Sequence, residues 1–113
     1  MYSISDALKQ LRVDPGEQRQ LSGRWSASWF VYERMLFGIV SGPLLWGRVA
    51  AMVMRATQAL GSTDRLRVEC YVDDPCLCAS GSQSEQVESR SVAVLLCSAM
   101  GFKLAWAKAH RGT

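Results

Sequence analysis

The chain has 113 residues, of which 49% are hydrophobic and 20% are charged, a composition that allows one globular domain and excludes a disordered or multi-domain chain. Thirteen basic against ten acidic residues give a net charge of +3, which permits contact with phosphate groups without requiring it. The sequence has no apolar run of the roughly 18 residues that a membrane span needs and no signal-peptide pattern at its start, so we expect no membrane partner. Its four cysteines fit no paired zinc site, so we expect reduced core thiols in an intracellular protein, cytoplasmic or nuclear.

The first third of the chain predicts a short helix and a β-hairpin. Good helix formers follow a polar cap at Ser5, so we expect a helix over 6–12, which Pro and Gly in 14–17 then end with a turn. Polar and apolar residues alternate in 19–25 and again in 29–35, which predicts two paired strands. These strands carry four aromatic residues, Trp25, Trp29, Phe30 and Tyr32. Aromatic side chains in a strand usually belong to the core, and base stacking is the alternative interpretation.

The longest predicted helix begins at Ser41-Gly42-Pro43, where a hydroxyl cap precedes a proline whose missing N–H is harmless in the first turn. We expect it to end at Gly61. Arg48 and Arg55 are expected on a solvated side, and contact with a nucleic-acid backbone is the alternative. The apolar face, which should pack against a sheet, is expected to consist of Leu45, Val49, Met52, Val53, Ala56 and Leu60.

A second hairpin with two adjacent acids at its tip is expected next. Residues 65–72 alternate between polar and apolar, as in a half-buried strand, and 76–79 form an apolar return strand. Asp73 and Asp74 are expected in the turn, which Pro75 closes. Two adjacent carboxylates repel each other unless a cation lies between them. One interpretation is a solvated Asp-Asp-Pro turn, and the other is a pair of divalent-metal ligands held on a rigid hairpin.

The last third predicts a helix and a strand. Ser82 and Glu85 form a capping-box pattern at the start of the helix, and Gly101 is expected to end it. Residues 102–108 alternate again and predict a strand. The helix should bury the face that contains Val87, Val94, Leu95 and Ser98. Helices and strands therefore interleave, which predicts an α+β fold with an antiparallel sheet backed by helices on one face.

Four segments, in order along the chain, carry a resemblance to a known family. Tyr71-Val72-Asp73-Asp74 resembles the Tyr-x-Asp-Asp catalytic box of reverse transcriptases, and Phe37-Gly38-Ile39-Val40-Ser41-Gly42-Pro43 resembles their Phe-Gly-x-x-Ser-x-Pro segment. The stretch 100–104 followed by Lys108 is similar to their Leu-Gly-Phe-x-Leu…Lys segment. The stretch 3–11 resembles their first box, usually Asp-x-x-Asp-Ala-aromatic.

The resemblance implies the palm of an RNA-directed DNA polymerase from a retroelement such as a retrotransposon. It implies that residues 1–113 form a single partial palm domain of polymerase-palm-like (ferredoxin-like) fold, with fingers and thumb largely absent. Template-directed nucleotidyl transfer with two Mg²⁺ or Mn²⁺ ions is the implied reaction. The implied partners are an RNA or DNA template-primer, dNTP and the missing parts of a larger polyprotein.

The resemblance also assigns roles to individual residues. Asp73 and Asp74 are the implied metal ligands and catalytic residues, together with Lys108, which would protonate the leaving pyrophosphate. Without the resemblance, Lys108 is an exposed lysine at the end of a strand. The implied nucleotide-binding residues are Asp6, Ala7, Leu8, Phe37, Gly38, Pro43 and Tyr71.

The sequence departs from the family's pattern at two positions of the first box. Ser3 occupies the place of an essential metal-binding aspartate, and a neutral hydroxyl binds Mg²⁺ far less well than a carboxylate. Asp6 lies three residues away and is not expected to replace that aspartate. Leu8 stands where the family usually has an aromatic residue that crowds the nucleotide's 2′ position. We therefore expect the isolated chain to be inactive.

Three interpretations follow. In the first, the chain is part of a reverse transcriptase that acts only within something larger. In the second, it is a non-catalytic relic or repurposed palm that binds nucleic acid or a protein partner. In the third, it is a small α+β domain without polymerase ancestry, which predicts that Asp73 and Asp74 do not lie on a hairpin facing the start of the chain.

Overall fold

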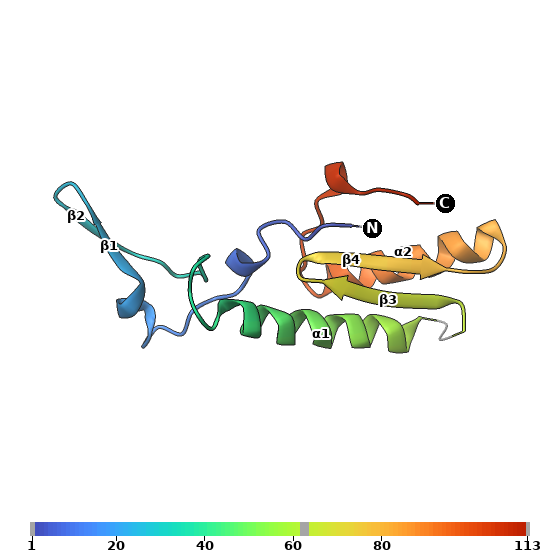
Figure 1. Ribbon diagram of the computed structural model, residues 1–113, viewed down its shortest axis with the longest axis horizontal. Coiled ribbons are helices and arrows are strands. Elements are labelled where there is room, and N and C mark those ends of the chain that lie inside the picture. Colours follow the sequence, from blue (N-terminus) through green and yellow to red (C-terminus); the bar gives the residue numbers. More distant parts are fainter. Residues whose placement is uncertain (1, 62–63, 113) are drawn as a thin grey trace.

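The protein is elongated, with a packed body and a hairpin that projects from one end of it. The computed structural model describes residues 2–61 and 64–112. These residues span 61 × 25 × 21 Å, and Figure 1 shows that the projecting hairpin accounts for one end of the long axis. The described residues contain no helix that is long and apolar enough to cross a membrane.

Two helices and a β-hairpin form the body. Strands β3 (Leu66–Tyr71) and β4 (Asp74–Ala79) pair antiparallel, and helices α1 (Gly42–Leu60) and α2 (Gln83–Ala99) lie on one face of the pair. In Figure 1, α1 runs along β3 and α2 lies behind β4. Alternate residues of β3, beginning with the fully buried Leu66, point toward the helices. The predicted α+β class, with an antiparallel sheet backed by helices, is confirmed.

The start of the chain extends this sheet at the outer edge of β4. The Tyr2 N–H donates to the Pro75 oxygen at 2.9 Å, and the Ile4 N–H donates to the Asp73 oxygen at 2.7 Å. Segment 2–4 therefore runs antiparallel to β4. The tip of the β3–β4 hairpin lies beside the start of the chain, which contradicts the prediction of the third interpretation.

A segment near the end of the chain completes the sheet. Ile4 forms an antiparallel bridge with Leu104, and the Ala105 N–H donates to the Ser3 oxygen at 2.7 Å. The order across the sheet is therefore 103–105, 2–4, β4 and β3. In chain order these elements alternate as β-α-β-β-α-β, the split βαβ arrangement of ferredoxin-like folds.

Helix α1 begins and ends where the sequence predicts, but it buries a different face. Pro43 lies in its first turn, and the Gly61 N–H donates to the Thr57 oxygen at its end. The predicted apolar face is wrong, because only Val53 of that set is buried and the large side chains of Leu45, Met52 and Leu60 are exposed. The buried residues of α1 are Gly42, Trp46, Ala50, Val53, Met54 and Thr57. This face combines the small residues Gly42 and Ala50 with the larger side chains of Trp46 and Met54, which belong to the core cluster.

Helix α2 has the predicted start and, again, a different buried face. The Ser82 hydroxyl accepts from the Glu85 N–H, and the Glu85 carboxylate accepts from the Ser82 N–H, which confirms the capping box. Ala93 and Cys97 are the buried residues of α2, whereas the predicted Leu95 is exposed. A small face suits α2 because it packs against both α1 and β4.

Two predicted elements in the terminal segments are wrong. The expected helix over 6–12 is reduced to the 3-10 turn η1 (Leu8–Gln10), because Asp6 has a positive φ of 49°, Leu11 is extended and Arg12 forms an antiparallel bridge with Arg34. The expected strand over 102–108 contributes only the bridge at Leu104 and then turns into η3 (Trp106–Lys108). Packing of Phe102 into the core and the bridge to segment 2–4 account for this short strand.

The predicted first hairpin is confirmed but is shorter than expected. A 3-10 turn, η2 (Gln18–Leu21), precedes β1 (Ser22–Trp25), which pairs antiparallel with β2 (Ser28–Val31). The expectation that its aromatic residues belong to the core is wrong, because all four are exposed. Among the described residues, no further layer of the body covers the two strands, which project away from it in Figure 1.

Candidate functional site

The β3–β4 turn lies one residue earlier than predicted, so that it contains only Asp73 of the two adjacent acids. Tyr71 pairs with Asp74, so Val72 and Asp73 form a two-residue turn and Asp74 is the first residue of β4. Pro75 therefore lies in the strand and does not close the turn. Val72 has a φ of 56°, a left-handed conformation that β-branched residues rarely adopt. Backbone strain of this kind occurs at sites where the surroundings hold it in place.

A buried tryptophan beneath the turn holds it in place. Trp46 of α1 is 2% exposed, and its indole N–H donates to the Val72 oxygen at 2.7 Å. Its ring packs edge to face against Phe102, with centroids 5.5 Å apart. Sequence reasoning missed Trp46, although a single large aromatic residue among the small residues Gly42 and Ala50 was an available signal.

Ser3 and Asp74 face each other across neighbouring strands. The two hydrogen bonds that attach segment 2–4 to β4 lie on either side of this pair, so that the two residues stand opposite. Tyr71 stands opposite Asp74 on the other side. Opposed residues of antiparallel strands share one face, with Cβ atoms roughly 4.5–5.5 Å apart. Tyr71, Asp74 and Ser3 therefore form a row on the face that points away from the helices.

The acids influence the thiol that lies under the turn. Burial, and then the carboxylates of Asp73 and Asp74, raise the pKa of Cys70 from 9.0 to about 11, with a smaller effect from Cys97. None of the ion pairs of the described residues includes Asp73 or Asp74. The turn is thus a locally negative point of the surface.

The side chains at the turn do not complete a site for two divalent ions. Among residues 2–61 and 64–112, no group of three or more His, Cys, Asp or Glu side chains is placed to hold a metal. Asp73 and Asp74 supply two carboxylates, and Ser3, which stands opposite Asp74, adds only a hydroxyl. Mg²⁺ prefers several oxygen ligands and binds mainly through carboxylates. The residues present therefore do not fit the metal pair that the resemblance implies.

The other predicted residues of the first box differ in their exposure to solvent. Asp6 is exposed and forms an ion pair with Lys9 at 3.1 Å. Ala7 and Leu8 lie in the hydrophobic core with Ile4. Their predicted contact with a nucleotide stays a prediction.

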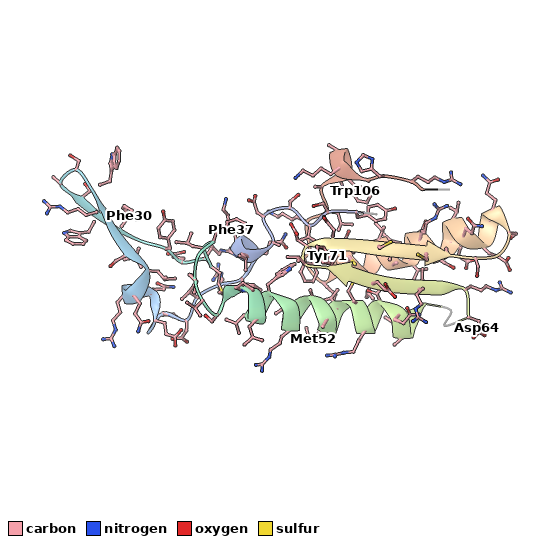
Figure 2. The ribbon with its side chains drawn as sticks, viewed as in Figure 1. Phe30, Phe37, Met52, Asp64, Tyr71 and Trp106 are labelled. Atoms are coloured by element: carbon pink, nitrogen blue, oxygen red, sulfur yellow. The ribbon has the colours of Figure 1, made fainter. Side chains whose placement is uncertain are left out.

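The remaining predicted residues are exposed. Phe37 and Gly38 lie before α1, between the projecting hairpin and the acidic turn, as the label of Phe37 in Figure 2 shows. Gly38 has a φ of 92°, which favours glycine, and open space surrounds it. Pro43 is exposed in the first turn of α1, and Lys108 ends η3 without an ion pair to the acids. The structure thus brings Ser3, Asp73, Asp74 and Tyr71 together, and it places Lys108 on a separate segment.

Comparison with known proteins supports the fold. No protein-family model matches the sequence, and no curated protein matches it. Among solved structures, the fold is similar to a crystal structure of prototype foamy virus protease-reverse transcriptase, a CSH mutant labelled with selenomethionine, with a TM-score of 0.72 and 14% sequence identity. The match covers 91% of this chain and 13% of that chain. The chain therefore has the fold of a small part of a retroviral protease-reverse transcriptase chain.

Proposed function

We propose that this chain is the palm part of a reverse transcriptase, an RNA-directed DNA polymerase of a retroelement, and that it is catalytically incomplete by itself. The observation that carries the proposal is that Ser3 faces Asp74 beside a strained turn bearing Asp73. This arrangement would be a cluster of three acidic residues if the serine were an aspartate. The likeness in fold to a protease-reverse transcriptase chain gives independent support.

In this proposal, the predicted residues at and near the turn have roles within a larger protein. Asp73 and Asp74 would be the acidic ligands of Mg²⁺ or Mn²⁺, and Tyr71 would flank the nucleotide. Gly38, with its open surroundings, would let a nucleotide approach the main chain, beside Phe37. The further nucleotide contacts of Asp6, Ala7, Leu8 and Pro43, and the general-acid role of Lys108, are proposed on the resemblance alone. The template-primer would be held by parts of a longer polyprotein.

The incomplete acid cluster favours a second candidate for the isolated chain. Among the described residues, no group of three or more acidic, His or Cys side chains is placed to hold a metal, so the second candidate is a palm that binds nucleic acid or another protein without catalysis. The two candidates share one fold and differ in whether a third carboxylate completes a working site. A substitution at Ser3 therefore separates them.

The experiment measures Mn²⁺ binding and primer extension in parallel. We expect Ser3→Asp to raise the affinity for Mn²⁺ by at least about ten-fold over the native chain, because it places a third carboxylate opposite Asp74 and near Asp73. Ser5→Asp is the matched control, since it adds the same charge to the same segment at a residue that bonds to Lys103 instead. The gain should disappear in the double variant that adds Asp73→Asn.

The two measurements answer different questions. Primer extension by Ser3→Asp that requires Asp73 would identify the chain as a polymerase palm with a single lost ligand. Tighter Mn²⁺ binding without extension would support the non-catalytic palm. Equal Mn²⁺ affinity for Ser3→Asp, Ser5→Asp and the native chain would contradict the proposed acid cluster itself.

A further inference from the structure

The face of the sheet that points away from the helices carries two free thiols. Cys76 and Cys78 belong to β4, and the register places them opposite Glu69 and Arg67 of β3. Both of these β3 residues are exposed, on the side away from the helices. Opposed residues of an antiparallel pair share one face, so both thiols lie on this outer face. Neither cysteine is in a disulfide.

The exposure of one thiol differs from the expectation of reduced core thiols. That expectation fits Cys97, which is buried, whereas Cys76 is half-buried and Cys78 is exposed. In a core, a cysteine packs as a small hydrophobic residue, but an exposed side chain contributes little packing. The chemistry of its thiol is therefore the property that Cys78 offers at this position.

The extended backbone of β4 sets the distance between the two thiols. Residues i and i+2 of a strand are roughly 6.5 Å apart, well beyond the Cβ–Cβ distance of about 3.5–4.5 Å that a disulfide needs. The two side chains nevertheless meet, because a hydrogen bond with Cys76 raises the pKa of the Cys78 thiol. The strand therefore holds the pair as an open dithiol, which cannot close into a disulfide without movement of the backbone.

An open pair of thiols suits a soft cation that needs only two ligands. Thiolates are soft ligands that favour Cu(I), whereas Zn²⁺ takes four ligands in its structural sites. In the part of the chain that the structure describes, no set of three or more His, Cys, Asp or Glu side chains could hold a metal ion. Two thiolates alone are enough for Cu(I), which two sulfur atoms can bind from opposite sides.

We infer that Cys76 and Cys78 bind one Cu(I) ion between their sulfur atoms on the outer face of the sheet. Two Cu–S bonds form, the two thiol protons pass to water, and no atom changes its oxidation state. The complex carries one negative charge, which Arg67, opposite Cys78 on the same face, can compensate. The inference goes beyond the proposed function and does not depend on it, because it uses neither the acidic turn nor a nucleotide.

The test is a titration of the reduced chain with Cu(I) in the absence of oxygen, in competition with bicinchoninate, a coloured Cu(I) chelator. We expect one ion per chain, and X-ray absorption of the complex should show two sulfur ligands and no third ligand. Cys76→Ser and Cys78→Ser should each weaken Cu(I) binding at least about 100-fold, because a single thiolate cannot chelate the ion.

Two control variants separate this pair from thiols in general. Cys70→Ser removes a thiol from the opposite face of the same hairpin and should leave the Cu(I) affinity within about three-fold of the native chain. The double variant Cys78→Ser/Ser80→Cys keeps the number of thiols but places the second one roughly 13 Å from Cys76 along the extended chain. It should lose as much affinity as Cys78→Ser alone. Circular dichroism verifies that each variant stays folded.

The outcomes are distinguishable from failure of the proposed function, because the titration contains no Mn²⁺, primer or nucleotide. Undiminished Cu(I) binding by Cys76→Ser would overturn the inference. Equal affinity of the native chain and Cys78→Ser/Ser80→Cys would overturn it too, since any two thiols would then suffice. One ion per two chains would assign the ligands to separate copies and would also contradict a site within one chain.

Discussion

The indole N–H of Trp46 donates to the main-chain oxygen of Val72 at 2.7 Å, so a buried side chain of α1 holds the one residue of the acidic turn with a positive φ. Trp46 is itself fixed by its contact with Phe102. The position of Asp73, the next residue in the turn, therefore depends on packing in the core and not on local turn preference alone. This arrangement suits a turn whose side chains must stay in one place.

Strain at Val72 gives the first prediction. We expect Val72→Gly to raise the free energy of unfolding by about 0.5–1 kcal/mol, because relief of roughly 1–3 kcal/mol of backbone strain exceeds the entropy cost of glycine. Urea denaturation measures the difference. The same substitution at Val68, which lies within β3 at an ordinary φ, should destabilise the protein. A loss of stability at both positions would show that the turn is not strained.

The Trp46–Val72 hydrogen bond gives the second prediction. Trp46→Phe keeps an aromatic ring beside Phe102 but removes the donor, so we expect a loss of about 1–2 kcal/mol in the free energy of unfolding. Thermal and urea denaturation measure it. Trp106→Phe, the same change at an exposed site, should alter stability by less than about 0.5 kcal/mol. Equal effects at the two tryptophans would contradict the anchoring role of Trp46.

Local sequence signals correctly predicted those helix starts and strands that depend only on residues close together in the sequence. The capping box at Ser82, the proline at position 43 and the alternation in 65–72 all correspond to observed elements. The acidic hairpin was predictable for the same reason. Its turn was displaced by one residue because the sequence favours Asp and Pro in turns, whereas the register places Val72 there.

The buried helix faces depended on tertiary packing and were not predictable from periodicity. In α1, Leu45 and Met52 form the more hydrophobic stripe, yet Ala50 and Thr57 on the neighbouring stripe are buried. Where α1 closely approaches β3 and α2, its contact face needs small residues such as Ala50. A periodicity of large apolar residues does not indicate that need. The prediction that the aromatic residues of the first hairpin are buried was wrong for a related reason. Their strand pattern predicts a layer that covers them, and the described residues do not supply that layer.

Cys70 gives the third prediction, which concerns pH. Burial and the nearby carboxylates of Asp73 and Asp74 raise its pKa from 9.0 to about 11. Because the folded-state value is the higher one, this thiol contributes stability below pH 9 that is lost as the pH rises toward 11. Alkylation of Cys70 by iodoacetamide, followed by mass spectrometry in a variant that retains only this cysteine, should stay slow at pH 8–9 and reach half its limiting rate near pH 11.

The acids provide the control for that measurement. Asp73→Asn in the same background removes one of the negative charges, so the pKa of Cys70 should fall and its alkylation at pH 9 should become about two-fold faster. Asp64→Asn removes an equal charge elsewhere on the surface and should have no such effect. A rate that does not respond to Asp73→Asn would show that the charge of Asp73 does not contribute to the raised pKa of Cys70.

Gln58 gives the last prediction, which concerns the free edge of β3. Its side-chain amide donates to the Leu66 oxygen at 2.5 Å and accepts from the Val68 N–H at 2.8 Å, so it pairs with the strand edge as a neighbouring strand would. Gln58→Leu removes both partners at once. We expect a loss of about 1–2 kcal/mol in the free energy of unfolding, together with self-association, because unpaired strand edges pair with other chains.

Two measurements test that expectation together. Urea denaturation gives the stability, and sedimentation velocity at increasing protein concentration gives the association state. Gln83→Leu adds the same apolar side chain to an exposed position at the start of α2 and should leave both nearly unchanged. If Gln83→Leu associates as strongly as Gln58→Leu, the added leucine and not the uncovered edge causes the association. If neither variant associates while Gln58→Leu is destabilised, the Gln58 amide stabilises β3 but does not prevent its edge from pairing with another chain.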